Sequence, residues 1–371
     1  MLKVGIIGTG RIFDLNVLGY LNNNDVEIIC LCNRTVEKAL KKIKQFNLNK
    51  STPVYSNYKK MLNQEELDIV EILLPHNLHA EATIFAANEG IKGISVQKPM
   101  ALSLEEANQM IEACNESGAI LSIYENFLFL PHILKAKELI DQDYIGDLSY
   151  IRIKVAMGAT GGWNIPESAD LWRKDPKKIG GHPNRGSPIL LDNGWHAFTL
   201  GWWFFGEEIE KVFAWADNYQ GIDAPAYVMW KCKENKEQEH VVPQYGNMEF
   251  SLMPEMVIPS NYYNTDEFIE IIGSRGIMKI NQGTAMGNIM SDSEIFAPIV
   301  IVRDGEVETY SDFEKDWKYS FINATKHFIE VVKGNKKPIL SGKQARYILK
   351  LNLAAIQSVE LGKDVYLVDM N

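Results

Sequence analysis

The sequence is poor in cysteine and has no long apolar run. Its 371 residues include 4 cysteines, too few and too scattered to crosslink a chain of this length. Cys30 and Cys32 stand two apart inside one apolar run, which is typical of a strand and not of a metal or redox pair. No apolar stretch approaches the ~20 residues that cross a bilayer, and the N-terminus shows no secretory leader. We therefore expect a cytoplasmic protein without a membrane segment.

Positive charge is also in short supply. The 38 basic residues are outnumbered by 48 acidic ones, which gives a formal net charge of −10. Proteins that bind nucleic acid need clustered Lys and Arg to displace counterions, so this balance argues against a nucleic-acid partner. With 46% hydrophobic and 23% charged residues, the chain has the composition of an ordinary globular protein, and its length predicts two domains.

Strand-like and helix-like patterns alternate over residues 1–125. Short apolar runs such as Val4–Ile7 and Gly93–Val96 are typical of strands buried on both faces, and helical stretches separate them. Strands that alternate with helices at this spacing form a parallel, doubly wound sheet. We therefore predict an α/β fold in which residues 1–125 form the first domain.

The pattern changes after Pro131. Strand-like segments then follow one another with few helices between them, which predicts a large, open and mostly antiparallel sheet within an α+β domain over residues 126–371. Two helices, about 321–332 and 343–361, end the chain and are candidates for packing back on the first domain.

A glycine-rich turn follows the first apolar run and consists of Gly8, Thr9, Gly10, Arg11, Ile12 and Phe13. In dinucleotide-binding folds the first glycine makes a tight turn, and the second lets the backbone approach the pyrophosphate. The third small residue of that pattern is missing, because Phe13 stands there. The turn lies after a strand and before a helix, so we predict that it binds NAD or NADP; a purely structural turn is the alternative.

Asn33 stands at the end of the second strand, where NAD-specific sites usually carry Asp or Glu for the ribose hydroxyl. An amide does not repel a 2′-phosphate, and Arg34 is a candidate to pair with one or to stack on adenine. NADP is therefore permitted beside NAD. Arg34 as a solvated residue at a helix start is the alternative.

Three further motifs resemble the Gfo/Idh/MocA family of glucose–fructose oxidoreductase and inositol dehydrogenases. They are the segments Leu74–Glu81, Val96–Pro99 and Leu191–His196, and Arg275-Gly276 extends the likeness into the later sheet. The resemblance implies a Rossmann domain and an α/β domain that assembles through its sheet into homo-dimers or homo-tetramers. It also implies cofactor contacts from Leu74, Pro75, His76, His79, Gln97 and Lys98.

By the same resemblance Lys98, Asp192 and His196 form the catalytic set. Oxidising a secondary alcohol requires a base for the hydroxyl proton, and a histidine titrates near neutral pH. Asp192 and His196 are four residues apart, so they project from one face if the helix has begun. Lys98 is suited to stabilise charge on the alcohol oxygen. An N-cap role for Asp192 and a core role for His196 are the alternatives.

Aromatic and polar residues near these motifs are candidates for contacting a sugar or cyclitol. Gln97 replaces a usual Glu, and residues 182–190 form an insertion that carries His182 and Arg185, either at the substrate cleft or in a surface loop. Trp195 is a further aromatic candidate. The substrate candidates are Tyr124, Asn126, Trp163, Trp172, Arg173, Arg185, Asp192 and His196.

The resemblance favours an NAD(P)-dependent dehydrogenase acting on a secondary alcohol of a sugar, sugar derivative or cyclitol. Two alternatives remain open: a cofactor-dependent enzyme that cleaves glycosides through transient oxidation, and a non-catalytic sugar sensor. No His, Cys, Asp or Glu cluster has metal-ligand spacing, so no metal site is expected.

Overall fold

The computed structural model describes residues 1–163, 175–180, 189–206, 208–219, 222–233, 242–282 and 297–370. The chain divides into two compact units. The first contains Met1–Asn126 and Ser320–Leu349, and the second contains Phe127–Tyr319 and Lys350–Asn371. Each unit therefore includes residues from the C-terminal part of the chain, and helix α12 (Gly342–Leu361) contributes to both.

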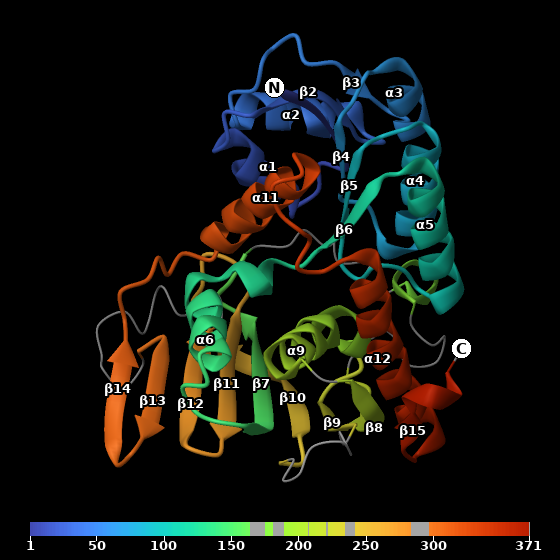
Figure 1. Ribbon diagram of the computed structural model, residues 1–371. Helices are drawn as coiled ribbons and strands as arrows, with labels where there is room; N and C mark the ends of the chain where they lie inside the picture. The colour runs from blue at the N-terminus through green and yellow to red at the C-terminus, as the bar shows by residue number, and fades with distance from the viewer. Residues whose placement is uncertain are drawn as a thin grey trace. The chain divides into compact units, whose positions relative to one another are not determined.

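The first unit holds a six-stranded sheet in the order β3-β2-β1-β4-β5-β6 (Figure 1). Every pairing between its neighbouring strands is parallel, which confirms the predicted doubly wound sheet. Apolar runs buried on both faces form its centre, since β4 is buried along its whole length. The strands are β1 (Leu2–Ile7), β2 (Val26–Cys32), β3 (Val54–Tyr55), β4 (Ile69–Ile72), β5 (Gly93–Gln97) and β6 (Ile120–Tyr124).

Helices cover both faces of this sheet (Figure 1). On one face, α1 (Phe13–Leu21), α2 (Val36–Gln45) and α11 (Lys318–Val332) enclose a core of buried apolar side chains. Helix α11 approaches α1 so closely that a Cβ at Gly19 would lie 2.3 Å from Thr325 Cβ. The other face carries α3 (Tyr58–Gln64), α4 (His79–Asn88) and α5 (Leu104–Ser117).

Glu71 lies in the middle of β4 and is completely buried. Tyr20 OH donates a hydrogen bond to its carboxyl group at 2.6 Å, and Asn16 Nδ2 donates another at 3.2 Å. Burial raises the pKa of Glu71 to about 7, because an ionised carboxylate loses its hydration there, although these hydrogen bonds partly oppose the shift. The first unit thus contains a carboxyl group that titrates near neutral pH.

In the described part of the second unit, nine strands form one sheet in the order β14-β13-β12-β11-β7-β10-β9-β8-β15. The pairings are antiparallel except for β7 with β10, so the prediction of a mostly antiparallel sheet is confirmed. The strands are β7 (Leu148–Thr160), β8 (Ile209–Ala216), β9 (Ala226–Cys232), β10 (Tyr245–Val257), β11 (Thr265–Gly273), β12 (Gly276–Gln282), β13 (Ile299–Arg303), β14 (Glu306–Tyr310) and β15 (Val365–Tyr366).

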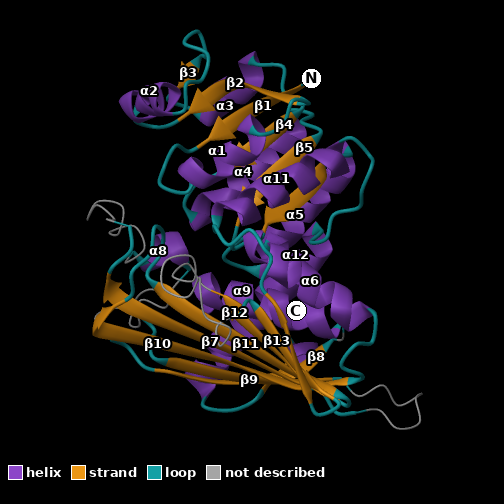
Figure 2. Ribbon diagram, turned by 90° about the vertical axis from the view of Figure 1, so that its left-hand side faces the viewer, coloured by secondary structure: helices purple, strands orange, loops and turns teal. Residues whose placement is uncertain are grey.

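One face of this sheet packs against α6 (Pro131–Asp141), α9 (Ile189–Phe205) and the second half of α12 (Figures 1 and 2). The opposite face leaves large apolar side chains exposed at one end, among them Trp215 at 58% and Met229 at 39%. Ion pairs cross its middle, where Arg152 meets Glu249 at 2.8 Å. The open sheet face is therefore mixed in character, apolar at one end and charged at its centre.

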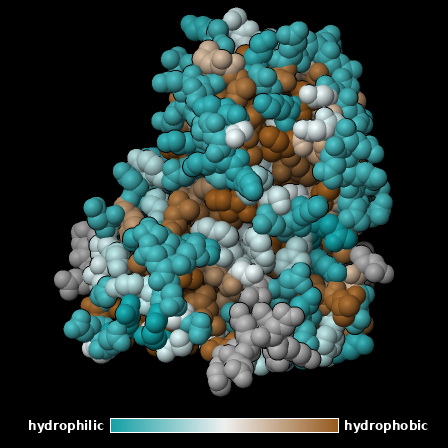
Figure 3. Space-filling view, viewed as in Figure 1, coloured by the Kyte–Doolittle hydropathy of each residue, from teal (hydrophilic) through white to brown (hydrophobic). Residues whose placement is uncertain are grey.

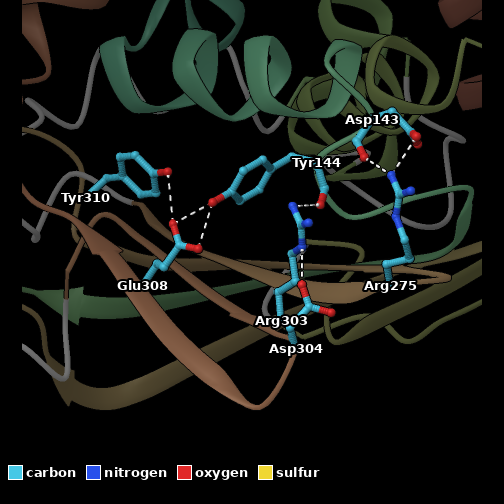
Figure 4. A network of polar contacts seen from close by, with 7 residues as sticks. All are labelled: Asp143, Tyr144, Arg275, Arg303, Asp304, Glu308 and Tyr310. Carbon is cyan, nitrogen blue, oxygen red and sulfur yellow. Dashed lines mark hydrogen bonds and ion pairs between the residues drawn. The ribbon is translucent and has the colours of Figure 1, made fainter.

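Figure 4 shows how the turn between α6 and β7 is fixed to the sheet edge. Asp143 adopts a left-handed conformation, with a φ of 58°, and Arg275 donates to both its backbone and side-chain oxygens. Tyr144 OH donates to the Glu308 carboxylate at 2.6 Å, and Arg303 Nη1 donates to the Tyr144 carbonyl at 2.9 Å. Arg275, one of the residues of the family resemblance, thus has a structural role in this turn.

His132 is buried in α6, and neither ring nitrogen has a hydrogen-bond partner among the described residues. Burial lowers its pKa from 6.5 to about 4, since the interior disfavours the imidazolium. The unfolded chain takes up this proton below pH 6.5, so stability falls as the pH drops from 6.5 towards 4.

We expect His132→Phe to remove this sensitivity to acid. The replacement ring keeps the edge contact with Phe313, whose centroid lies 6.3 Å away. Between pH 7 and pH 5 the wild type should lose about 2 kcal/mol more unfolding free energy than the variant, which urea denaturation at both pH values measures. An equal loss in both proteins would contradict the assignment.

Hydrophilic residues, coloured teal, predominate on the face shown in Figure 3, and brown apolar residues appear between them. None of the helices that the structure describes combines the length and the apolar composition needed to span a bilayer.

Candidate functional site

The glycine-rich turn connects β1 to α1 and depends on Gly8. Its φ is +100°, and a Cβ there would lie 2.3 Å from the Leu73 carbonyl oxygen. The Gly8 N–H donates to the Cys32 carbonyl at 2.8 Å, which holds the turn against the end of β2. Only glycine fits this position without moving Leu73, which directly follows β4.

The next residues of the turn fit a dinucleotide. A Cβ on Gly10 would meet nothing within 4 Å, so a ligand has room to approach the backbone there. The Thr9 side chain is 3% exposed, and its hydroxyl has no hydrogen-bond partner in the described part of the chain. Phe13, which replaces the third small residue, is fully buried and packs edge-on against Phe46.

Asn33 braces this turn from the end of β2. Its Oδ1 accepts from the Thr9 N–H at 3.3 Å, and its Nδ2 donates to the Thr35 carbonyl at 2.8 Å. Both polar groups of Asn33 are therefore used within the chain, while the neighbouring Arg34 is exposed. Arg34 is therefore the residue of this pair whose side chain is accessible to a ligand.

The segments after β4 and β5 were both predicted to contact the cofactor, and the polar atoms of the His79 ring are used within the chain. His79 is completely buried, and its ring nitrogens lie 2.8 Å from the carbonyl oxygens of Pro99 and Leu74. It therefore presents no polar atom to a ligand. Gln97 Oε1 accepts from the Lys98 N–H at 3.1 Å, and Gln97 Nε2 is buried without a partner among the described residues.

Tyr124 and Asn126 were predicted to reach the substrate, and both are 4% exposed. Tyr124 OH donates to the Phe321 carbonyl at 2.8 Å, and Asn126 Nδ2 donates to Ser320 Oγ at 3.0 Å. These bonds connect the end of β6 to α11 within the first unit. The Tyr124 hydroxyl and the Asn126 amide thus both have partners within the chain, and a substrate contact by either residue stays a prediction.

Asp192 and His196 both lie on α9, which begins at Ile189. Because the helix starts three residues before Asp192, this residue is in the first turn and is not the N-cap. Both side chains are half-buried. The ring of Phe127 stacks on His196 with centroids 4.0 Å apart and planes at 25°, which fixes the orientation of the imidazole.

An aromatic cluster extends from this stack. Phe127 contacts Trp317 edge-on at 6.4 Å, and Trp317 also contacts Trp163 at 6.4 Å. Tyr262 and Tyr263 complete the cluster at 5.4 Å and 5.9 Å from Trp317. Sequence reasoning had found only Trp163, because residues so far apart in the chain give no local signal of their proximity.

Several predicted residues cannot be placed at the site. Trp195 is fully buried, which excludes it from a substrate wall. Trp172, Arg173 and Arg185 lie outside the described residues, as does nearly all of the 182–190 insertion. Among the residues that are described, no three His, Cys, Asp or Glu side chains are arranged to hold a metal ion.

Comparison with known proteins gives matches over both units. The myo-inositol 2-dehydrogenase of Thermotoga maritima is 25% identical over 100% of this chain and 99% of its own length. The D-glucoside 3-dehydrogenase of Escherichia coli is 23% identical over 99% of this chain and 97% of its own. An uncharacterized oxidoreductase of Streptococcus pneumoniae is 32% identical over 49% of this chain and 46% of its own.

A crystal structure of scyllo-inositol dehydrogenase from Lactobacillus casei, with bound NAD(H) and scyllo-inositol, has the same fold. Its TM-score is 0.74 at 16% identity, and the match covers 100% of both chains. Residues 2–125 match the oxidoreductase family with an NAD-binding Rossmann fold, and residues 137–367 match its C-terminal α/β domain. The chain therefore belongs to the Gfo/Idh/MocA oxidoreductase family, and its N-terminal domain is an NAD-binding Rossmann domain.

Proposed function

We propose that the protein is an NAD(P)-dependent dehydrogenase that oxidises a secondary alcohol of a sugar, sugar derivative or cyclitol. The observation that carries this proposal is the pair Asp192 and His196, one helical turn apart and half-buried on α9, in a chain of this family. The inositol and glucoside dehydrogenases among its relatives support the substrate class.

Three side chains have proposed roles. His196 accepts the hydroxyl proton of the substrate. Asp192 places its carboxyl group beside His196 on the same helix. Lys98 hydrogen-bonds the alcohol oxygen and stabilises the negative charge that develops there. When bound, the nicotinamide supplies the hydride acceptor. In the first unit, Gly8, Thr9, Gly10, Arg11 and Ile12 would hold the dinucleotide.

The test combines each cofactor with a panel of myo-inositol, scyllo-inositol and D-glucosides and follows the absorbance of reduced nicotinamide. We expect reduction of NAD or NADP with at least one polyol. Glycoside cleavage without net reduction, or binding without any turnover across the panel, would contradict the proposal and favour one of the other two activities considered above.

We expect Gly10→Ala to weaken binding of NAD at least tenfold without changing the melting temperature. The protein leaves space for this methyl group, so only a ligand approaching the backbone would meet it. Fluorescence titration and thermal unfolding measure the two quantities. An NAD affinity of Gly10→Ala equal to that of the wild type would show that the dinucleotide does not contact this turn.

The proposal includes assembly as a homo-dimer or homo-tetramer through the open sheet face, in the cytoplasm. The exposed Trp215, Met229 and Tyr245 on or beside this face support an interface of the kind that large apolar patches form. Light scattering of the wild type and of Trp215→Glu tests it, since the charge should shift the assembly towards monomers. A monomeric wild type would exclude it.

A further inference from the structure

His79 occupies an unusual position at the start of α4. It is 0% exposed, and its Nδ1 and Nε2 each lie 2.8 Å from a backbone carbonyl oxygen. The first carbonyl belongs to Pro99, directly after Lys98, and the second to Leu74, directly before Pro75. One imidazole ring therefore spans the segments that follow two neighbouring parallel strands, β4 and β5.

A histidine ring is suited to this bridge because its two nitrogens point in diverging directions. The neutral ring carries one N–H and donates to one carbonyl at a time, whereas the imidazolium donates to both. Burial lowers the pKa of His79, although the two carbonyls oppose the shift. Neither carbonyl belongs to a regular strand, so the ring replaces ladder bonds that these segments do not make.

We propose that His79 is a positioning residue that holds the Lys98–Pro99 turn against the Leu74–Pro75 segment. This inference rests on the proposed function, because it assigns His79 to the placement of a proposed catalytic lysine and not to contact with the ligand. The two bonds have separate consequences. With the proton on Nδ1, the bond to Pro99 fixes the turn that carries Lys98; with the proton on Nε2, the bond to Leu74 fixes the segment expected to contact the dinucleotide.

Two conservative variants separate these bonds. The amide nitrogen introduced by His79→Asn takes the place of Nδ1, and the amide nitrogen introduced by His79→Gln takes the place of Nε2. We expect His79→Asn to keep kcat within about threefold of wild type while NAD affinity falls. His79→Gln should keep NAD affinity while kcat falls about tenfold or more, since small displacements of a reacting group lower rates strongly. His79→Phe should lose both.

Thr83→Val is the matched control. Thr83 is also fully buried on α4, and its hydroxyl donates to the His79 carbonyl at 2.7 Å, not to the carbonyl of Leu74 or Pro99. We expect kcat and NAD affinity close to wild type. The three His79 variants could instead lose kcat and NAD affinity together, in proportion to the decrease in their melting temperatures. In that case His79 serves only packing, and the proposal is wrong.

Amide hydrogen exchange without ligand keeps this test separate from the proposed function. His79→Phe should expose the backbone at residues 74–78 and 98–102 to faster exchange, whether or not the wild type oxidises any polyol. Unchanged exchange in both segments would overturn the positioning role. A wild type that shows the exchange effect but reduces no cofactor would reject the dehydrogenase and leave the bridge established.

Discussion

Lys98→Met is expected to lower kcat by about two to three orders of magnitude, the largest effect predicted for any single substitution in this protein. Removing one preorganised donor from a developing oxyanion raises the barrier by about 3–4 kcal/mol. Methionine retains most of the apolar stem of lysine, so NAD affinity should stay within a few-fold of wild type. Steady-state kinetics with the best polyol of the panel and fluorescence titration measure the two effects.

Lys92→Met is the control for this change. Lys92 directly precedes β5, at the opposite end of the strand that leads to Lys98, and its side chain is exposed. The same loss of charge should leave kcat unchanged there. Full activity of Lys98→Met would remove this residue from the catalytic set, and a comparable loss in Lys92→Met would point to a general electrostatic effect.

Glu71→Gln should make the first unit more stable above pH 7 by about 3 kcal/mol. In the folded protein the carboxyl has a pKa of about 7, against 4.5 in the unfolded chain, so the folded state holds a proton that the unfolded state has lost between these values. The contribution of Glu71 to the unfolding free energy is fully present below pH 4.5 and decreases as the pH rises to 7. Glutamine does not titrate and avoids this loss.

The site can accommodate the amide. Tyr20 OH can donate to the new amide oxygen, and the new amide nitrogen can donate to Asn16 Oδ1, which has no partner among the described residues, once the Asn16 side chain turns over. Urea denaturation of both proteins at pH 5 and pH 8 measures the effect. A constant difference between them at the two pH values would show that Glu71 does not titrate in this range.

The two units should therefore respond to pH in opposite directions. Protonated Glu71 stabilises the folded first unit at low pH. Neutral His132 stabilises the folded second unit at higher pH. Both transitions fall between about pH 4 and pH 7. Because the two effects have opposite signs, they offset each other in the unfolding free energy of the wild type measured against pH. The variants Glu71→Gln and His132→Phe each remove one effect and so reveal the other.

Local patterns predicted much of the first unit. The apolar run Val4–Ile7, predicted as a buried strand, lies within β1. Strand alternation and the glycine turn depend on neighbours in sequence, so they are visible without coordinates. Asp192 and His196 could be placed on one helix face for the same reason.

The remainder depends on contacts between distant residues. Nothing near Phe127 in the sequence indicates that its ring stacks on His196, or that Trp317 joins the same cluster. The family resemblance implied a cofactor contact for His79, and only the structure shows that both of its ring nitrogens lie 2.8 Å from backbone carbonyl oxygens. The partner of the Tyr124 hydroxyl could not be predicted for the same reason, because Phe321 is 197 residues away in the sequence.

The return of α11 to the first unit has a consequence for biosynthesis. Phe328, Ile329 and Val332 of α11 complete the core that α1 and β1 begin, yet residues 127–319 emerge from the ribosome between them. The second unit likewise needs residues 350–371. Neither unit can close until the last part of the chain has been made, so the nascent protein carries uncovered apolar surface through most of its translation.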